Sequence, residues 1–223
     1  MSTYVDDVLI SEANPNAVED LLKSTEPRFD KQDLGSAFYL LGMEIKHNRG
    51  LRTLHLSQNK YADDIIHRFG MDSCNSTLLD SKDHGTYREI VGSLLYFCRL
   101  TWPDISYAVM QLSRVVSKPY AIRMTAAKRL LRYLKGTATL GIKYLGSASP
   151  SPAPVLEGFC DADYGGDLAI RKSCTGYTFF LAQGPIVWDS KLQSLVTQSS
   201  TESEYIGLAL ACNEAVYVRD LLH

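Results

Sequence analysis

The chain has 223 residues, of which 45% are hydrophobic and 22% charged, and its formal net charge at pH 7 is −2. These values are typical of one large or two small globular domains. The five cysteines are odd in number and include no Cys-x-x-Cys pair, which excludes a disulfide framework and a zinc site and predicts an intracellular protein, cytoplasmic or nuclear. No apolar run is long enough to cross a bilayer, so we expect no membrane partner.

The N-terminal stretch reads Tyr4-Val5-Asp6-Asp7 and continues into the apolar run Val8-Leu9-Ile10. Two interpretations are open for the adjacent aspartates. They form an ordinary turn, or they lie at a hairpin tip where carboxylates hold metal ions. Further on, apolar segments at 37–45 and 51–56 flank Asn48-Arg49-Gly50, which predicts a β-hairpin. Ser57 is then the predicted cap of a helix from about 58 to 69.

The middle of the chain is helical by pattern and basic by composition. Helical periodicity covers 87–99, Pro103 favours the first turn of a helix that reaches about 117, and a third helix is predicted from 123 to 135, ending at Gly136. Residues 105–156 contain no aspartate or glutamate but eight lysines and arginines. Such asymmetry indicates a polyanionic partner for this segment.

The third of these helices shows the asymmetry best. Its predicted apolar stripe is Ala127, Leu130, Leu131 and Leu134, and its predicted opposite face carries Lys128, Arg132 and Lys135. A solvated helix face is one interpretation. Because solvated faces normally mix charges of both signs, we favour a nucleic-acid contact. The candidate nucleic-acid-binding residues here are Arg123, Lys128, Arg129, Arg132 and Lys135.

Residues 147–154 are rich in serine and proline, and we interpret them as a linker between a domain at 1–146 and another at 155–223. The second domain is predicted to contain strands at 155–163, 174–182 and 186–191, followed by a helix at 200–221. The expected fold class is α/β, with α and β elements partly segregated (α+β).

Two carboxylates of the second domain are candidates for metal chemistry. Asp161 follows an apolar run that predicts a buried strand, and Glu204 lies in the first turns of the last helix. A strand carboxylate facing a helix carboxylate across a cleft can hold magnesium ions for phosphodiester hydrolysis. The alternative for Glu204 is a capping box with Thr201, unless Glu202 caps the helix with Ser199. Arg171 and Lys172 contact a phosphate or lie on a solvated hairpin tip.

Four sequence motifs between 161 and 205 occur in the order found in a known family. They are Asp161-Ala162-Asp163-Tyr164-Gly165-Gly166-Asp167, Arg171-Lys172-Ser173-Cys174-Thr175-Gly176-Tyr177, Pro185-Ile186-Val187-Trp188-Asp189-Ser190-Lys191 and Ser199-Ser200-Thr201-Glu202-Ser203-Glu204-Tyr205. This stretch resembles the RNase H domain of copia-type retrotransposon polyproteins. The Tyr-x-Asp-Asp turn and the segment from 127 to 137 are similar to the reverse transcriptase and connecting region of the same polyproteins.

The resemblance implies roles for particular residues. Asp161 and Glu204 would be two members of a four-carboxylate Mg²⁺ site, and Asp6 and Asp7 would belong to the metal-binding turn of a reverse transcriptase. Leu41, Gly42, Met43 and Glu44 would form a primer grip, although an ordinary two-stranded ribbon is equally compatible with this stretch. The implied substrates are RNA–DNA hybrid or duplex.

The resemblance also implies a fold, and with it an expectation about activity. The fold is the end of a reverse transcriptase palm and thumb, a helical connection, and an incomplete RNase H-like domain of three antiparallel strands and a helix. This chain lacks the upstream polymerase aspartate and the last two RNase H carboxylates, so we expect no catalysis by the chain alone. The alternative is a non-catalytic nucleic-acid-binding remnant. The edge of the first RNase H strand is expected to be bare and open to another polypeptide that completes the sheet.

Overall fold

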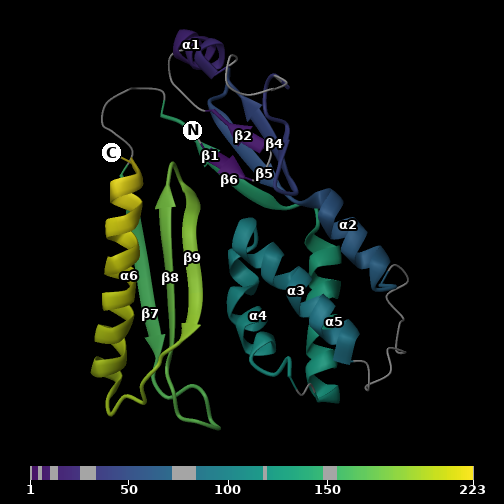
Figure 1. The fold of residues 1–223 in the computed structure, drawn as a ribbon. Helices are drawn as coiled ribbons and strands as arrows, with labels where there is room; N and C mark the ends of the chain where they lie inside the picture. The colour runs from purple at the N-terminus through teal and green to yellow at the C-terminus, as the bar shows by residue number, and fades with distance from the viewer. Residues whose placement is uncertain are drawn as a thin grey trace. The chain divides into compact units, whose positions relative to one another are not determined.

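The computed structural model describes residues 2–4, 7–10, 15–25, 34–71, 84–117, 120–147 and 155–222. They belong to two compact units, Met1–Leu40 and Leu41–His223. The fold is mixed α/β, and the strand pairs whose register is defined are antiparallel, as the sequence predicted (Figure 1). No helix in the described ranges is both long and apolar enough to span a bilayer.

The first unit contains two short strands, a helix and a two-residue strand. These are β1 (Ser2–Tyr4), β2 (Asp7–Leu9), α1 (Pro15–Thr25) and β3 (Tyr39–Leu40). Tyr4 pairs with Asp7 across the antiparallel β1–β2 ladder, and residues 5 and 6 between the two strands lie outside the described residues. The helix α1 begins at a proline, whose fixed φ and missing N–H suit a first helical position. It was not predicted from the sequence.

The second unit begins with a sheet whose strands β4 (Met43–Asn48), β5 (Thr53–Ser57) and β6 (Gly141–Leu145) are antiparallel neighbours. The predicted hairpin at Asn48-Arg49-Gly50 is therefore confirmed. The third strand, β6, joins it from more than eighty residues further along the chain. In the register of this sheet, Leu54 lies directly between His47 and Tyr144. The three side chains consequently share one face.

A helical layer follows, and it holds most of the described core. Its elements are α2 (Asn59–Arg68), α3 (His84–Leu100), the 3₁₀ helix η1 (Pro103–Ile105), α4 (Ser106–Ser113) and α5 (Ala121–Thr137). Tyr87, Leu94, Phe97 and Leu131 are fully buried among these helices. The Tyr87 hydroxyl donates to the carbonyl of Leu112 at 2.9 Å, so this buried polar group is satisfied.

Several predicted helix boundaries differ from the observed ones. Ser57 does not cap α2, because the N-cap residue is Gln58 and no side chain accepts a capping hydrogen bond there. The helix predicted to reach 117 ends as α4 at Ser113, and turns follow it. α5 runs through Gly136 to Thr137, since a single glycine lowers helix propensity without ending a helix that packs on its neighbours.

The C-terminal part consists of β7 (Glu157–Asp163), β8 (Cys174–Leu181), β9 (Gly184–Leu192) and α6 (Ser200–Leu222). The strands form an antiparallel sheet in the order β7-β8-β9, and α6 runs alongside β7 (Figure 1). The three predicted strands and the predicted helix are present, with shifted ends. Within the described residues, β7 pairs only with β8, so its outer edge is open.

Side-chain contacts join this sheet to the preceding helices and to β6. The indole Nε1 of Trp188 donates to the carbonyl of Cys98 at 2.6 Å, and Tyr144 donates through its hydroxyl to the carbonyl of Pro185 at 2.8 Å. Arg114, which follows α4, forms an ion pair with Asp167 in the β7–β8 loop. Residues 148–154 of the predicted linker lie outside the described residues, and the predicted domain boundary stays a prediction.

Gln193, directly after β9, connects the sheet to α6. Only 2% of its surface is exposed. Its side-chain Nε2 donates to Thr175 Oγ1 and to the carbonyl oxygen of Ser203, both at 2.9 Å, and its backbone N–H donates to the carbonyl of Ser173. One carboxamide therefore ties the end of β9 to β8 and to the first turn of α6.

The turn between β8 and β9 contains two residues with backbone dihedrals that glycine normally supplies. Ala182 and Gln183 have φ of 50° and 65°, as in a two-residue type I′ hairpin turn. The left-handed region costs a residue with a Cβ about 1–2 kcal/mol. The Ala182 carbonyl accepts a hydrogen bond from the backbone N–H of Leu145 in β6, which helps to hold this turn in place.

We predict that Gln193→Leu destabilises the fold by roughly 2–4 kcal/mol, because Thr175 Oγ1 and the Ser203 carbonyl lose a buried donor. The measurement is urea unfolding followed by circular dichroism. Gln198→Leu is the matched control, since Gln198 is exposed and its side chain makes no described hydrogen bond. Equal unfolding midpoints for the two variants would contradict the role of Gln193.

A second prediction concerns the strained turn. Gln183→Gly should stabilise the protein by roughly 0.5–1 kcal/mol, because the strain relieved exceeds the extra entropy of glycine in the unfolded chain. Lys191→Gly in β9 should have the opposite sign, since glycine in a strand only loses side-chain packing and adds unfolded-state entropy. Thermal unfolding of both variants measures this, and destabilisation by Gln183→Gly would show that the turn is not strained.

Candidate functional site

The predicted strand carboxylate, Asp161, lies in β7 and is exposed. Its neighbour Ala162 is buried against α6, where a Cβ placed on Gly207 would lie 3.5 Å from the Cβ of Ala162. Because side chains alternate along a strand, Asp161 is on the sheet face that α6 does not cover. It is next to the open edge of the sheet, and within the described residues no hydrogen bond or ion pair involves its carboxylate.

The predicted helix carboxylate, Glu204, is exposed in the first turns of α6. The start of this helix is capped by other groups. Ser199 Oγ accepts from the backbone N–H of Glu202 at 3.1 Å, and the Glu202 carboxylate accepts from the backbone N–H of Gln198 at 2.7 Å. This confirms the alternative in which Glu202 and Ser199 cap the helix. No described hydrogen bond involves the Glu204 carboxylate, so it is free for other chemistry.

The thiol of Cys160 lies within electrostatic range of both carboxylates. Partial burial raises its pKa, and the negative charges of Glu204 and Asp161 raise it further. Burial likewise raises the pKa of the Cys98 thiol to about 11. Both thiols are therefore protonated at neutral pH and poorly nucleophilic. Asp161 lies on the sheet face that α6 leaves uncovered, whereas Glu204 belongs to α6 on the other face.

Asp161 and Glu204 offer the oxygen donors that Mg²⁺ prefers. Nevertheless, no group of three or more histidine, cysteine, aspartate or glutamate side chains that could hold a metal ion occurs among the described residues. Two exposed carboxylates only partly fit a two-metal site, because they supply fewer oxygen ligands than two magnesium ions need.

Two neighbouring acids have structural roles, as expected for turn residues. The Asp163 carboxylate accepts a hydrogen bond from the backbone N–H of Cys174. Asp167 accepts from the backbone N–H groups of Ala169 and Ile170 at 2.9 and 3.0 Å and pairs with Arg114. These hydrogen bonds and the guanidinium together lower the pKa of the Asp167 carboxyl.

The predicted basic face of α5 needs a correction. Lys128 is only 8% exposed, and Lys135 is half-buried with its Nζ 3.4 Å from the carbonyl of Met71. The prediction was wrong for these two because α5 packs against α2, α3 and α4, which makes its buried side wider than a single apolar stripe. The exposed arginines are Arg129 and Arg132, whereas Arg123 is half-buried.

The other predicted phosphate contacts lie at the β7–β8 loop. Arg171 is exposed and has φ of 55°, and its backbone N–H donates to the carbonyl of Asp167. The Nζ of Lys172 donates to the carbonyl of Ser194 at 2.6 Å. Arg171 is thus available to a ligand, while the ammonium group of Lys172 already has a partner within the fold.

The predicted primer-grip residues begin the second unit. Leu41 and Gly42 form a turn with φ of 50° and 71°, and Met43 and Glu44 open β4. The hydroxyl of Tyr96 in α3 donates to the Leu41 carbonyl at 2.5 Å, which fixes this turn against the helix. Of the predicted polymerase aspartates, Asp6 lies outside the described residues, and Asp7 is the first residue of β2.

Sequence reasoning missed three residues that hold the candidate site together. Gln193 ties α6 to the sheet, Arg114 pairs with the loop after β7, and Tyr96 supports the Leu41–Gly42 turn. Of the three, only Gln193 lies between a predicted strand and the predicted start of a helix. A glutamine there gives no periodic signal, so pattern analysis could not have found it.

Comparison with known proteins identifies the family. Residues 1–81 match the model for reverse transcriptase (RNA-dependent DNA polymerase). The chain is 36% identical, over 98% of its length, to the retrovirus-related Pol polyprotein from transposon TNT 1-94 of Nicotiana tabacum, and 37% identical, over its whole length, to that from transposon RE1 of Arabidopsis thaliana. It spans only 18% and 16% of those polyproteins.

Shorter relatives match over most of their own length. An uncharacterized mitochondrial protein of Arabidopsis thaliana is 37% identical, with 92% of it covered. A putative transposon Ty5-1 protein of Saccharomyces cerevisiae is 33% identical, with 70% covered. No solved structure matches significantly. The chain therefore belongs to the copia-type retrotransposon Pol polyproteins, and its N-terminal part to their reverse transcriptase.

Proposed function

We propose that this chain is a nucleic-acid-binding segment of a copia-type reverse transcriptase and RNase H, which holds an RNA–DNA hybrid or duplex and does not catalyse by itself. One observation carries the proposal. The stretch 105–156 has no acidic residue, and within it α5 exposes Arg129 and Arg132.

The geometry of α5 supports a contact with phosphates. Arg129 and Arg132 are three positions apart, so they lie on one side of the helix. No salt bridge involves either guanidinium in the described part of the chain. The Nε of Arg132 is 3.4 Å from the carbonyl of Lys128, which leaves its remaining donors for a ligand. Tyr133, 43% exposed, lies beside them.

A second candidate function, hydrolysis of the RNA strand of a hybrid, is favoured by the exposed carboxylates of Asp161 and Glu204. By resemblance, β7, β8, β9 and α6 would be part of an RNase H-like domain, with Mg²⁺ as the cofactor. Another polypeptide could pair with the open edge of β7 and bring further carboxylates close to Asp161. Because the described residues offer only these two carboxylates for such a site, the chain should hold Mg²⁺ weakly and cleave a hybrid very slowly or not at all.

The binding proposal predicts a distinction between two kinds of basic residue. Arg129→Ala with Arg132→Ala should weaken binding to an RNA–DNA hybrid and reduce the slope of log affinity against log salt by about 0.9 for each phosphate that the variant no longer binds. Lys128→Ala should instead lower the free energy of unfolding and leave that slope unchanged. Fluorescence anisotropy over a salt series measures the first effect, and urea unfolding the second.

The matched control for this experiment is Arg219→Ala combined with Lys46→Ala, which removes the same charge from α6 and β4. Both control side chains are exposed. An unchanged salt slope in the Arg129/Arg132 variant, or an equal change in the control, would contradict a contact at α5.

The proposal that the chain alone does not catalyse is tested by incubating the purified chain with Mg²⁺ and a labelled RNA–DNA hybrid. We expect no cleavage, and no saturable Mg²⁺ binding at micromolar concentrations by calorimetry. Asp161→Asn and Glu204→Gln serve as controls for contaminating nuclease. Cleavage by the parent chain that both variants lose would show that the two carboxylates suffice, and it would refute the non-catalytic proposal.

A further inference from the structure

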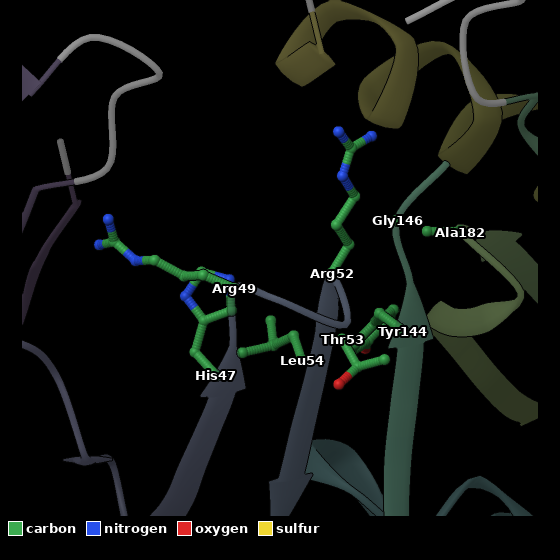
Figure 2. Close-up of a pocket in the computed structure, with 8 residues that line it drawn as sticks. All are labelled: His47, Arg49, Arg52, Thr53, Leu54, Tyr144, Gly146 and Ala182. Carbon is green, nitrogen blue, oxygen red and sulfur yellow. The ribbon is translucent and has the colours of Figure 1, made fainter. Parts of the chain in front are cut away.

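A pocket of about 400 Å³ lies at the end of the β4–β5–β6 sheet, next to the β8–β9 turn. Its eight lining residues are His47, Arg49, Arg52, Thr53, Leu54, Tyr144, Gly146 and Ala182 (Figure 2). The volume is in the range of small-ligand sites. None of the lining residues is acidic, and three carry basic side chains. The pocket is therefore suited to an anion.

The floor of the pocket is fixed by strand register, and its apolar part is Leu54 with the ring of Tyr144. His47, Leu54 and Tyr144 are opposite one another on β4, β5 and β6. Figure 2 shows Leu54 in the middle, with His47 and Arg49 on one side of it and Arg52 on the other. Tyr144 is held by its hydroxyl, which donates to the Pro185 carbonyl. An apolar floor between cations suits a phosphate attached to an organic group.

The two arginines lie in a turn whose backbone is held by hydrogen bonds. Asn48 Oδ1 accepts from the backbone N–H of Leu51 at 2.9 Å, and the Arg52 N–H donates to the Arg49 carbonyl at 3.3 Å. The Arg52 carbonyl accepts from the N–H of Gly146 at 2.7 Å. A ligand consequently meets a backbone that is already ordered, and less entropy is lost on binding.

The charge of this pocket is not neutralised within the fold. No salt bridge in the described ranges involves Arg49 or Arg52. One Nη of Arg52 donates to the carbonyl of Ser147, which orients the guanidinium and leaves other donors available. By contrast, Lys46 on β4 pairs with Glu44. Guanidinium groups bind phosphate oxygens through paired hydrogen bonds, which makes phosphate the matching ligand.

We infer that the pocket between the β4–β5 turn and β6 binds phosphate groups, with Arg49 and His47 as donors on one side of Leu54 and Arg52 as the donor on the other. The phosphate belongs to a nucleic-acid backbone or to a free phosphate compound such as pyrophosphate. This site deepens the proposed nucleic-acid binding, on which it rests, but uses residues other than those of α5. The two proposals can therefore fail separately.

The test compares Arg49→Gln/Arg52→Gln with the control Lys46→Gln/Arg219→Gln, which has the same net charge. Lys46 is a close control because it is next to His47 on β4 but faces the other side of the sheet. The probes are a labelled single-stranded DNA, followed by anisotropy, and inorganic pyrophosphate, followed by calorimetry. Urea unfolding of each variant confirms that it is folded.

At low salt we expect the pocket variant to bind at least one probe about tenfold more weakly than the control variant does. For the single strand, the salt slope should fall by about 0.7 for each arginine that contacts a phosphate. Loss of DNA binding alone identifies a nucleic-acid backbone as the ligand, and loss of pyrophosphate binding identifies a free phosphate compound. If the pocket and control variants bind both probes equally, the inference is wrong, whatever the Arg129/Arg132 variant shows.

Discussion

The position of α6 against the β7–β8 sheet depends on one buried carboxamide and one missing side chain. Gln193 donates to Thr175 in β8 and to the carbonyl of Ser203, the residue directly before Glu204. One turn later, a Cβ on Gly207 would be 3.3 Å from Thr175 Cγ2, which is closer than ordinary contact. Thr175 therefore accepts the hydrogen bond from Gln193 and also leaves little room for a side chain at position 207. Any movement of α6 would move Glu204 relative to Asp161.

This arrangement explains why the two carboxylates remain exposed although the groups around them are buried. Ser173, Thr175, Gln193, Thr197 and Ser203 are all nearly inaccessible. Ser173 Oγ accepts from the N–H of Gly165 and pairs with the Thr197 hydroxyl. Buried hydroxyls and one amide connect the loop, the strand and the helix, and the charged groups that also hold the loop, Arg114 and Asp167, leave Asp161 and Glu204 unpaired within the described residues. The charged oxygens of Asp161 and Glu204 stay on the surface, where water solvates them and a ligand can reach them.

Much of the fold could be predicted from the sequence, because local patterns determine it. The β4–β5 hairpin follows from a glycine-containing turn between apolar runs, and β7 to β9 follow from short apolar runs separated by turn residues. The strand β6 was missed because Gly141–Leu145 is only five residues long and its partner β5 is distant in sequence. Long-range pairing of this kind leaves no periodic signal within a short segment.

The candidate site was less predictable, since burial depends on packing. Lys128 occupies a position that helical periodicity assigns to solvent, and it is buried because α5 contacts three other helices. Its long alkyl stem can lie along apolar neighbours. Glu204 shows the reverse case. The sequence allowed a capping role, and only the observed hydrogen bond between Glu202 and Ser199 shows that another group makes the cap.

Two separate basic surfaces have consequences for how nucleic acid could be held. One is a pair of arginines on α5, a helix of the packed core, and the other is a pocket at the end of a sheet whose strand β6 directly follows α5 in sequence. Contacts on rigid elements lose little entropy when they bind, so each weak phosphate contact can add to the other. A nucleic-acid strand can contact both surfaces at once, whereas a small anion can occupy only one. Binding of a long strand should therefore depend on both sets of arginines together.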